Sequence, residues 1–191
     1  MKYEKFLEII ERESTSLKHE EKVAICLMCC NRLAPLYSEF AQVEKWGDPA
    51  LLTKCREKAA TWIIDSKGNS EISTEDLEKI IPDSEDFGSL LGSYAQNASI
   101  AHSYLLDQLE TNDRQPLIWV LHKCYDTIDF YVQEVLDPNM EGNLSSAEIE
   151  DHPAMVSEVF WQIEKLESIR NNLNLPEYIE KYKNEPILNV A

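Results

Sequence analysis

The chain has 191 residues, 43% of them hydrophobic, which is enough for one sizeable core but short for two domains. Its formal net charge is -17 at pH 7. Most of the acidic excess lies between Glu71 and Glu158, where the basic residues are Lys79, Arg114 and Lys123. Such a surface repels phosphate backbones and anionic lipid headgroups, so we expect the protein to bind neither nucleic acid nor a membrane surface.

The composition of the chain also indicates its compartment. The longest apolar run, residues 23–30, is far shorter than the roughly 18 residues that a membrane-spanning helix needs. The first five residues lead into charged amphipathic sequence rather than into the apolar core of a signal peptide. The five cysteines sit mostly within apolar helical stripes, as buried reduced thiols do. We therefore expect a cytoplasmic protein whose single helical domain spans residues 1–191.

Apolar residues at helical spacing begin near the N-terminus. Residues 3–12 predict a first helix, and a second helix is predicted from about Leu17. The centre of this second helix, residues 23–30, is apolar on all sides, so we expect it to lie in the middle of the fold. Pro35 should kink or restart this helix, because proline lacks the N–H group that a helix interior needs.

Turn and capping residues divide the next part of the chain. Gly47, Asp48 and Pro49 predict the end of one helix and the start of another. Residues 73–76 resemble a capping sequence and predict a short helix that runs to Ile81. The residues that the third helix should bury are Leu52, Cys55, Ala59, Trp62 and Ile63.

Two long amphipathic helices follow, in which apolar residues recur at spacings of three and four. The first series is Phe87, Leu91, Tyr94, Ala98, Ala101 and Leu105, and the second is Leu117, Leu121, Cys124, Ile128, Tyr131 and Val135. Pro153 opens a further predicted helix, and a short last helix is expected near Tyr178. Because strand-like alternation is absent, the predicted fold is all-α, a single-domain bundle of about six to eight helices around a central apolar helix.

A family resemblance rests on an ordered set of residues. These are Cys30, Arg32, Pro35, Tyr37, Phe40, Gly47-Asp48, Trp62, Ile81-Pro82, Asp86-Phe87, Ala95, Ala98, Ala101, Pro153, Glu158 and Gln162. Over residues 22–169 the chain resembles the domain of unknown function 416 family (DUF416), the bacterial YjaG-like proteins. The resemblance implies an all-α fold, no established activity and a genomic association with histidine-kinase signalling. It offers no catalytic residues to carry over.

Arg32 follows the apolar run of the second helix and should therefore lie close to the core. A buried guanidinium usually pairs with a carboxylate, and Glu158 or Asp86 is the expected partner. We expect an architectural ion pair, and the alternative is a pocket for an anionic ligand. The candidate ligand-binding or ion-pair residues are Arg32, Tyr37, Asp86 and Glu158.

Residues 137–148 align with the calcium-binding loop of an EF-hand. The oxygen ligands would be Asp137, Asn139, Glu141, the backbone of Asn143, Ser145 and Glu148. Pro138, Pro153 and the lack of a second, paired loop argue against calcium. We therefore expect no cofactor and a solvated connection in which Ser145 or Ser146 caps the next helix, with calcium as the alternative.

The other reactive side chains favour structural roles. Cys26 and Cys29 have the spacing of a redox motif but lie in the middle of an apolar helix, which indicates core packing. His102 and His122 would serve acid-base chemistry if a cleft brought them together, although hydrogen-bonded structural histidines are more common in bundles. The sequence has no nucleophile elbow and no phosphate-binding glycine loop.

We therefore favour a non-enzymatic interaction or regulatory module, linked to signalling, that docks a basic protein partner through its acidic central surface and exposed aromatic side chains. One alternative is a bundle pocket that binds a small molecule or a metal through Arg32, a histidine and nearby carboxylates. A second alternative is an immunity-type antidote that masks a basic toxin. Association with a second copy of the chain also stays open.

Overall fold

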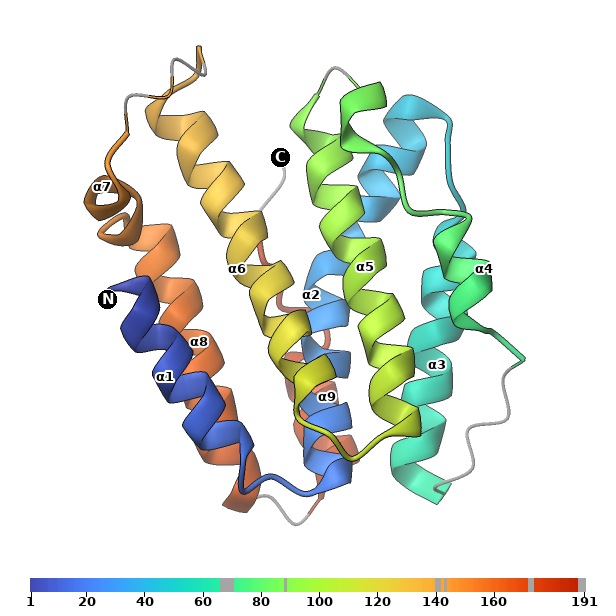
Figure 1. The fold of residues 1–191 in the computed structure, drawn as a ribbon. Helices are drawn as coiled ribbons and strands as arrows, with labels where there is room; N and C mark the ends of the chain where they lie inside the picture. Colours follow the sequence, from blue (N-terminus) through green and yellow to red (C-terminus); the bar gives the residue numbers. More distant parts are fainter. Residues whose placement is uncertain (66–70, 88, 140–141, 143, 172–173, 189–191) are drawn as a thin grey trace.

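The computed structural model describes residues 1–65, 71–87, 89–139, 142, 144–171 and 174–188, and this part of the chain is helical without a strand (Figure 1). Its elements are α1 (Tyr3–Ser14), α2 (His19–Glu44), α3 (Pro49–Asp65), α4 (Thr74–Glu78), the 3-10 turn η1 (Ser84–Asp86), α5 (Leu90–Glu110), α6 (Gln115–Leu136), α7 (Ser146–Glu150), α8 (Pro153–Ser168), the 3-10 turn η2 (Ile169–Asn171) and α9 (Leu175–Tyr182). The predicted all-α bundle is confirmed. Its helices outnumber the expected six to eight because α7 forms where a turn was expected. None of the described helices is long and apolar enough to cross a membrane.

Helix α2 lies at the centre of the bundle, as its apolar sequence predicts. It packs against α3, α5, α6 and α9, and every residue from 23 to 30 is buried. In Figure 1, α1 and α8 lie on one side of the molecule, α3 and α4 lie on the other, and α9 lies behind α2. Because α2 is covered in this way, a polar side chain on its buried faces needs a partner within the protein.

Pro35 lies inside α2, which continues without a break to Glu44, so the helix does not restart there. Because proline has no N–H, it donates no hydrogen bond to the carbonyl of Asn31. At the next position, the carbonyl of Arg32 accepts a hydrogen bond of 3.4 Å from the N–H of Ile187. The C-terminal segment is thereby attached to the turn of α2 that the proline disturbs.

Helices α5 and α6 are the two predicted amphipathic helices, but their apolar series extend past the buried parts. Phe87 precedes α5 in an extended conformation, and its ring packs edge-on at 4.8 Å from the ring of Phe40. Val135, the last residue of the second series, is 50% exposed near the end of α6. Helical spacing therefore placed the start of α5 too early and overestimated the burial at the end of α6.

The turn between α2 and α3 is organised by Tyr37. Its hydroxyl donates a hydrogen bond of 2.8 Å to the carbonyl of Ile80 and accepts one of 3.4 Å from the N–H of Asp48. Gly47 has a φ of 86°, and a Cβ atom at this position would collide with the Tyr37 hydroxyl. The left-handed residue that ends α2 is Lys45 (φ 55°), so the helix ends two residues before Gly47, the glycine that the sequence suggested as its end.

Replacing Gly47 with alanine should lower the free energy of unfolding by about 2 to 3 kcal/mol, since the positive φ alone costs roughly 1 to 2 kcal/mol and the contact with Tyr37 adds to it. Gly142→Ala is the matched control, because Gly142 also has a positive φ of 72° but no atom within 4 Å of a Cβ. Urea unfolding of both variants measures the difference. Equal losses would show that the contact with Tyr37 contributes nothing.

Candidate functional site

Arg32 of α2 and Glu158 of α8 form a buried ion pair. Nη1 of Arg32 donates a hydrogen bond of 3.1 Å to Oε1 of Glu158, and Nη2 donates one of 2.8 Å to Oε2. The two residues are 5% and 2% exposed. Burial alone would lower the pKa of Arg32, but the charge and hydrogen bonds of Glu158 raise it overall.

The surroundings of this pair are those of a structural contact. The guanidinium carbon of Arg32 lies 3.8 Å from the ring centre of Trp161, which covers the pair. Nε2 of Gln162 donates to Oε1 of Glu158 at 2.8 Å and to the carbonyl of Leu121 in α6 at 3.1 Å. Because these groups occupy both oxygens of Glu158 and both terminal nitrogens of Arg32, the pair serves to hold α2, α6 and α8 together.

The other two members of the predicted set lie elsewhere. Asp86 is exposed in η1 and does not contact Arg32 in the described structure. The partner of Arg32 is Glu158, so the expectation that Asp86 could be the partner is wrong. Tyr37 is fully buried, and its hydroxyl serves the α2–α3 turn described above. The four candidates therefore do not converge on one pocket.

The two histidines considered in the sequence have different neighbours, and the Cys55 thiol lies beside one of them, donating a hydrogen bond of 3.3 Å to the carbonyl of His102. All five cysteines are free and buried, and burial raises the pKa of the Cys55 thiol to about 12. His102 is fully buried in α5, where its Nδ1 donates a hydrogen bond of 2.7 Å to the carbonyl of Ala98. His122 in α6 instead lies beside Tyr3 of α1, with 6.2 Å between ring centres.

Part of the predicted calcium loop lies outside the described residues, namely Glu141 and Asn143, so the calcium alternative stays a prediction. Glu148 accepts hydrogen bonds from the Ser145 hydroxyl and N–H at 2.6 and 2.9 Å, and the Ser145 hydroxyl caps α7 in turn. Asp137 accepts a hydrogen bond of 2.7 Å from the N–H of Gly142. Ser145 is thus one of the two caps expected for a solvated connection.

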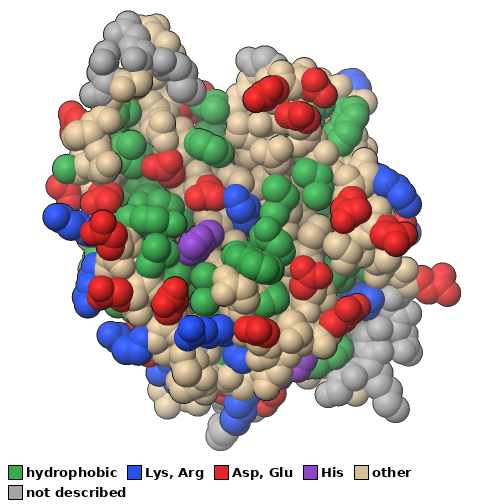
Figure 2. Space-filling view, viewed as in Figure 1, with side chains coloured by type: hydrophobic (Ala, Val, Ile, Leu, Met, Phe, Trp, Pro, Cys, Tyr) green, Lys and Arg blue, Asp and Glu red, His purple; other side chains and the backbone are tan. Residues whose placement is uncertain are grey.

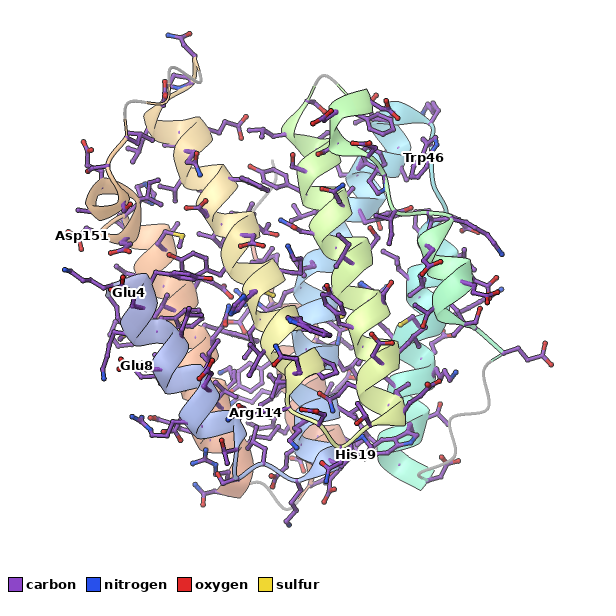
Figure 3. All side chains as sticks on the ribbon, viewed as in Figure 1. Glu4, Glu8, His19, Trp46, Arg114 and Asp151 are labelled. Carbon is purple, nitrogen blue, oxygen red and sulfur yellow. The ribbon has the colours of Figure 1, made fainter. Side chains whose placement is uncertain are left out.

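A cavity of about 570 Å³ opens between α1, α6 and α7. Its lining residues are Lys2, Tyr3, Glu4, Tyr125, Asp129, Ser146, Ala147, Ile149 and Glu150. The rings of Tyr3 and Tyr125 are 4.8 Å apart at their centres. Figure 2 shows hydrophobic side chains exposed in this region among Asp and Glu side chains, and Figure 3 labels Glu4 on α1 and Asp151 at the end of α7 nearby.

The carboxylates of this cavity have neutral partners. Glu150 accepts a hydrogen bond of 3.1 Å from the N–H of Tyr3, and Asp129 accepts one of 2.7 Å from the amide of Gln133. Burial, followed by the charge of Asp126, raises the pKa of Asp129, and burial with the charges of Asp126 and Asp129 raises the pKa of Tyr3. Negative charge is therefore disfavoured in the cavity, and a cation would be favoured.

Sequence reasoning missed this cavity because its walls come from three distant segments. Tyr3 and Glu150 are 147 positions apart in the chain, and neither belongs to a recognisable motif. The four-residue spacing of Tyr125 and Asp129 places both on one side of α6 and was the available signal. The same spacing of polar and aromatic residues is found on the exposed face of any amphipathic helix.

Comparison with known proteins identifies the family. The family model described as "Protein of unknown function (DUF416)" matches residues 10–187. The chain belongs to the DUF416 family. This confirms the resemblance drawn from residues 22–169, and the description of DUF416 names no activity.

Among solved structures, the fold is similar to the crystal structure of a DUF416 family protein from Shewanella baltica OS155. The TM-score is 0.77 at 23% sequence identity, over 91% of this chain and 92% of that chain. At this identity the likeness shows the DUF416 fold alone. No match is found among the curated proteins.

Replacing Arg32 with methionine should lower the free energy of unfolding by about 3 to 5 kcal/mol, because it leaves the charge of Glu158 buried and unpaired. The double variant Arg32→Met with Glu158→Leu should be more stable than either single variant, since it removes both charges together. Urea unfolding of the wild type, the two single variants and the double variant measures these differences in the free energy of unfolding. Unchanged stability of Arg32→Met would contradict an architectural role and favour a ligand pocket.

His102 should make the protein sensitive to acid. Burial is the largest cause that lowers its folded-state pKa, from 6.5 to about 3. Between these values the unfolded chain binds the proton and the folded protein does not, so stability falls as the pH falls below 6.5. We expect a loss of about 2 kcal/mol between pH 7 and pH 5 from this group alone.

The measurement is urea unfolding at both pH values for the wild type and for His102→Gln. The pH-dependent part of the stability should decrease by about the same amount, roughly 2 kcal/mol, in the variant. His152→Gln is the matched control, because the partly exposed His152 lies at the start of α8. An identical pH dependence in the wild type and in His102→Gln would show that His102 protonates without unfolding.

Proposed function

We propose that this protein is an interaction module that docks a basic protein partner at the face formed by α1, α6 and α7. The observation that carries the proposal is the cavity lined by Tyr3, Tyr125, Asp129 and Glu150. It combines two aromatic rings with carboxylates that have no cationic partner among the described residues. A guanidinium group fits such a site, because it can bind carboxylates with paired N–H groups while its plane stacks on a tyrosine ring.

The surface around the cavity has the same character. Glu4 also lines it, and Lys2 is the single base among the lining residues. Phe130, the neighbour of Asp129 in the chain, is 36% exposed. Aromatic side chains beside a strongly negative surface are typical of docking sites for basic partners, where charge speeds encounter and the rings provide contact area.

The protonation states of the buried core groups also agree with a binding role rather than a catalytic one. At neutral pH the buried thiol of Cys55 is protonated and the buried imidazole of His102 is neutral. Neither group is solvent-accessible, so they are poorly placed for covalent or acid-base chemistry on a substrate. These features favour a regulatory, non-enzymatic role within the DUF416 fold.

The proposal is tested with a fluorescently labelled hexa-arginine peptide, whose binding is followed by anisotropy at several salt concentrations. Affinity should fall as salt rises, because the contact is electrostatic. Asp129→Asn and Glu150→Gln should each weaken binding by about threefold to tenfold, as expected for the loss of one partly buried charge contact.

Glu78→Gln is the matched control, because it removes the same charge from α4, on the opposite side of the molecule in Figure 1. Glu78 is exposed and belongs to the same acidic part of the chain. Its variant should bind the peptide as the wild type does. If Glu78→Gln weakens binding as much as Asp129→Asn, the peptide senses only the net charge and the proposed face is wrong.

A further inference from the structure

Arg56 of α3 is half-buried and has no acidic partner within ion-pair distance among the described residues. Its Nε donates to the carbonyl of Leu52 at 3.3 Å, Nη1 to Oδ1 of Asn31 at 3.4 Å, and Nη2 to the Thr53 hydroxyl at 3.1 Å. A guanidinium has five N–H groups, so two remain without an acceptor among the described residues.

Two adjoining cavities meet at this side chain. One, of about 360 Å³, lies between α2 and residues 183–186, and the other, of about 310 Å³, lies between α2, α3 and α9. Asn31, Arg56 and Lys183 line both cavities. We call the combined space the α2–α3–α9 groove, and it lies on the side of α2 where α9 is seen behind it in Figure 1.

The walls of the groove are mostly apolar. Leu27, Ala60 and Ile179 contribute at one end, and Ala34, Pro35 and Pro186 contribute at the other. The missing N–H of Pro35 leaves the adjacent turn of α2 without one of its hydrogen bonds, so the groove follows the disturbed part of the central helix. Apolar walls around a cation are typical of sites for small organic anions.

Two of the three glutamates that line the groove have partners, and for Glu180 that partner is Lys183 of the groove itself. Glu180 accepts a hydrogen bond of 3.2 Å from Lys183, and Glu185 accepts one of 2.8 Å from the indole N–H of Trp161. The third, Glu57, is exposed and is not within ion-pair distance of Arg56 in the described structure. Burial lowers the pKa of Arg56 despite the charge of Glu57, whereas Glu158 raises that of the more deeply buried Arg32.

We propose that the α2–α3–α9 groove binds a small organic anion whose carboxylate or phosphate group pairs with the free N–H groups of Arg56, beside Asn31 and Lys183. Both groups present oxygens at the spacing that a guanidinium recognises. The short apolar part of the ligand lies against Leu27 and Ile179. This site is separate from the proposed docking face, and neither proposal depends on the other.

The test is an NMR titration of the wild-type protein with sodium phosphate and, separately, with sodium butyrate, at an ionic strength held constant with sodium chloride. We expect saturable shifts of the Arg56 Nε–H and the Asn31 side-chain amide with at least one of the two anions. Saturation with butyrate but not with phosphate identifies a carboxylate site, and the reverse identifies a phosphate site. Shifts that grow linearly with both anions would overturn the proposal.

The variant Arg56→Gln should bind the effective anion at least tenfold more weakly. Arg114→Gln is the matched control, because Arg114 also donates only to neutral oxygens, the Glu11 carbonyl and the Thr15 hydroxyl, but lies outside the groove. It should bind as the wild type does. Equal binding by Arg56→Gln and the wild type would refute the site.

A second variant keeps the test decisive if circular dichroism shows that the Arg56→Gln protein is unfolded. Lys183→Gln changes a surface residue after the end of α9, and it should weaken anion binding by at least threefold, since a second positive charge is lost from the groove. Wild-type affinity in a folded Lys183→Gln protein, together with failure of Arg56→Gln to fold, would count against the proposal.

Discussion

The whole arrangement depends on a helix that is covered on every side. Residues 23–30 of α2 are buried, so a charge placed one turn later must be satisfied inside the protein. Arg32 meets this requirement through Glu158 and Trp161, and its backbone carbonyl separately accepts the N–H of Ile187. One residue thereby links α2 to α8 and to the C-terminal segment. Because an apolar pair could slide along the helices whereas a bidentate ion pair cannot, we infer that this contact fixes the register of α8.

The same helix separates two electrostatic environments. On the side of α1, α6 and α7, carboxylates and tyrosines surround a cavity with one lysine at its edge. On the side of α3 and α9, Arg56 is left with neutral acceptors. Glu57 also lines this side but is not within ion-pair distance of Arg56 in the described structure. The separation therefore offers one surface to cations and a different one to anions.

The fold could be predicted from the sequence, whereas most of the site could not. Helix positions follow from apolar spacing, and the Arg32–Glu158 pair follows from the rule that a buried guanidinium needs a carboxylate. Phe87 was misplaced because an apolar residue at the right spacing can also pack from an extended segment. The walls of the cavity and of the groove come from segments more than 100 residues apart in the chain, and local patterns carry no information about such contacts.

The two arginines of the helical interior show why burial alone does not distinguish architecture from binding. Arg32 is the more deeply buried, yet its terminal nitrogens are satisfied by Glu158, so a ligand would have to displace a fixed carboxylate. Arg56 is less buried, has no carboxylate partner among the described residues and has open space beside it. Anion binding at Arg32 is disfavoured, because separating a buried ion pair costs several kcal/mol before any ligand contact forms. For this reason the anion-binding role that the sequence suggested for Arg32 fits Arg56 better.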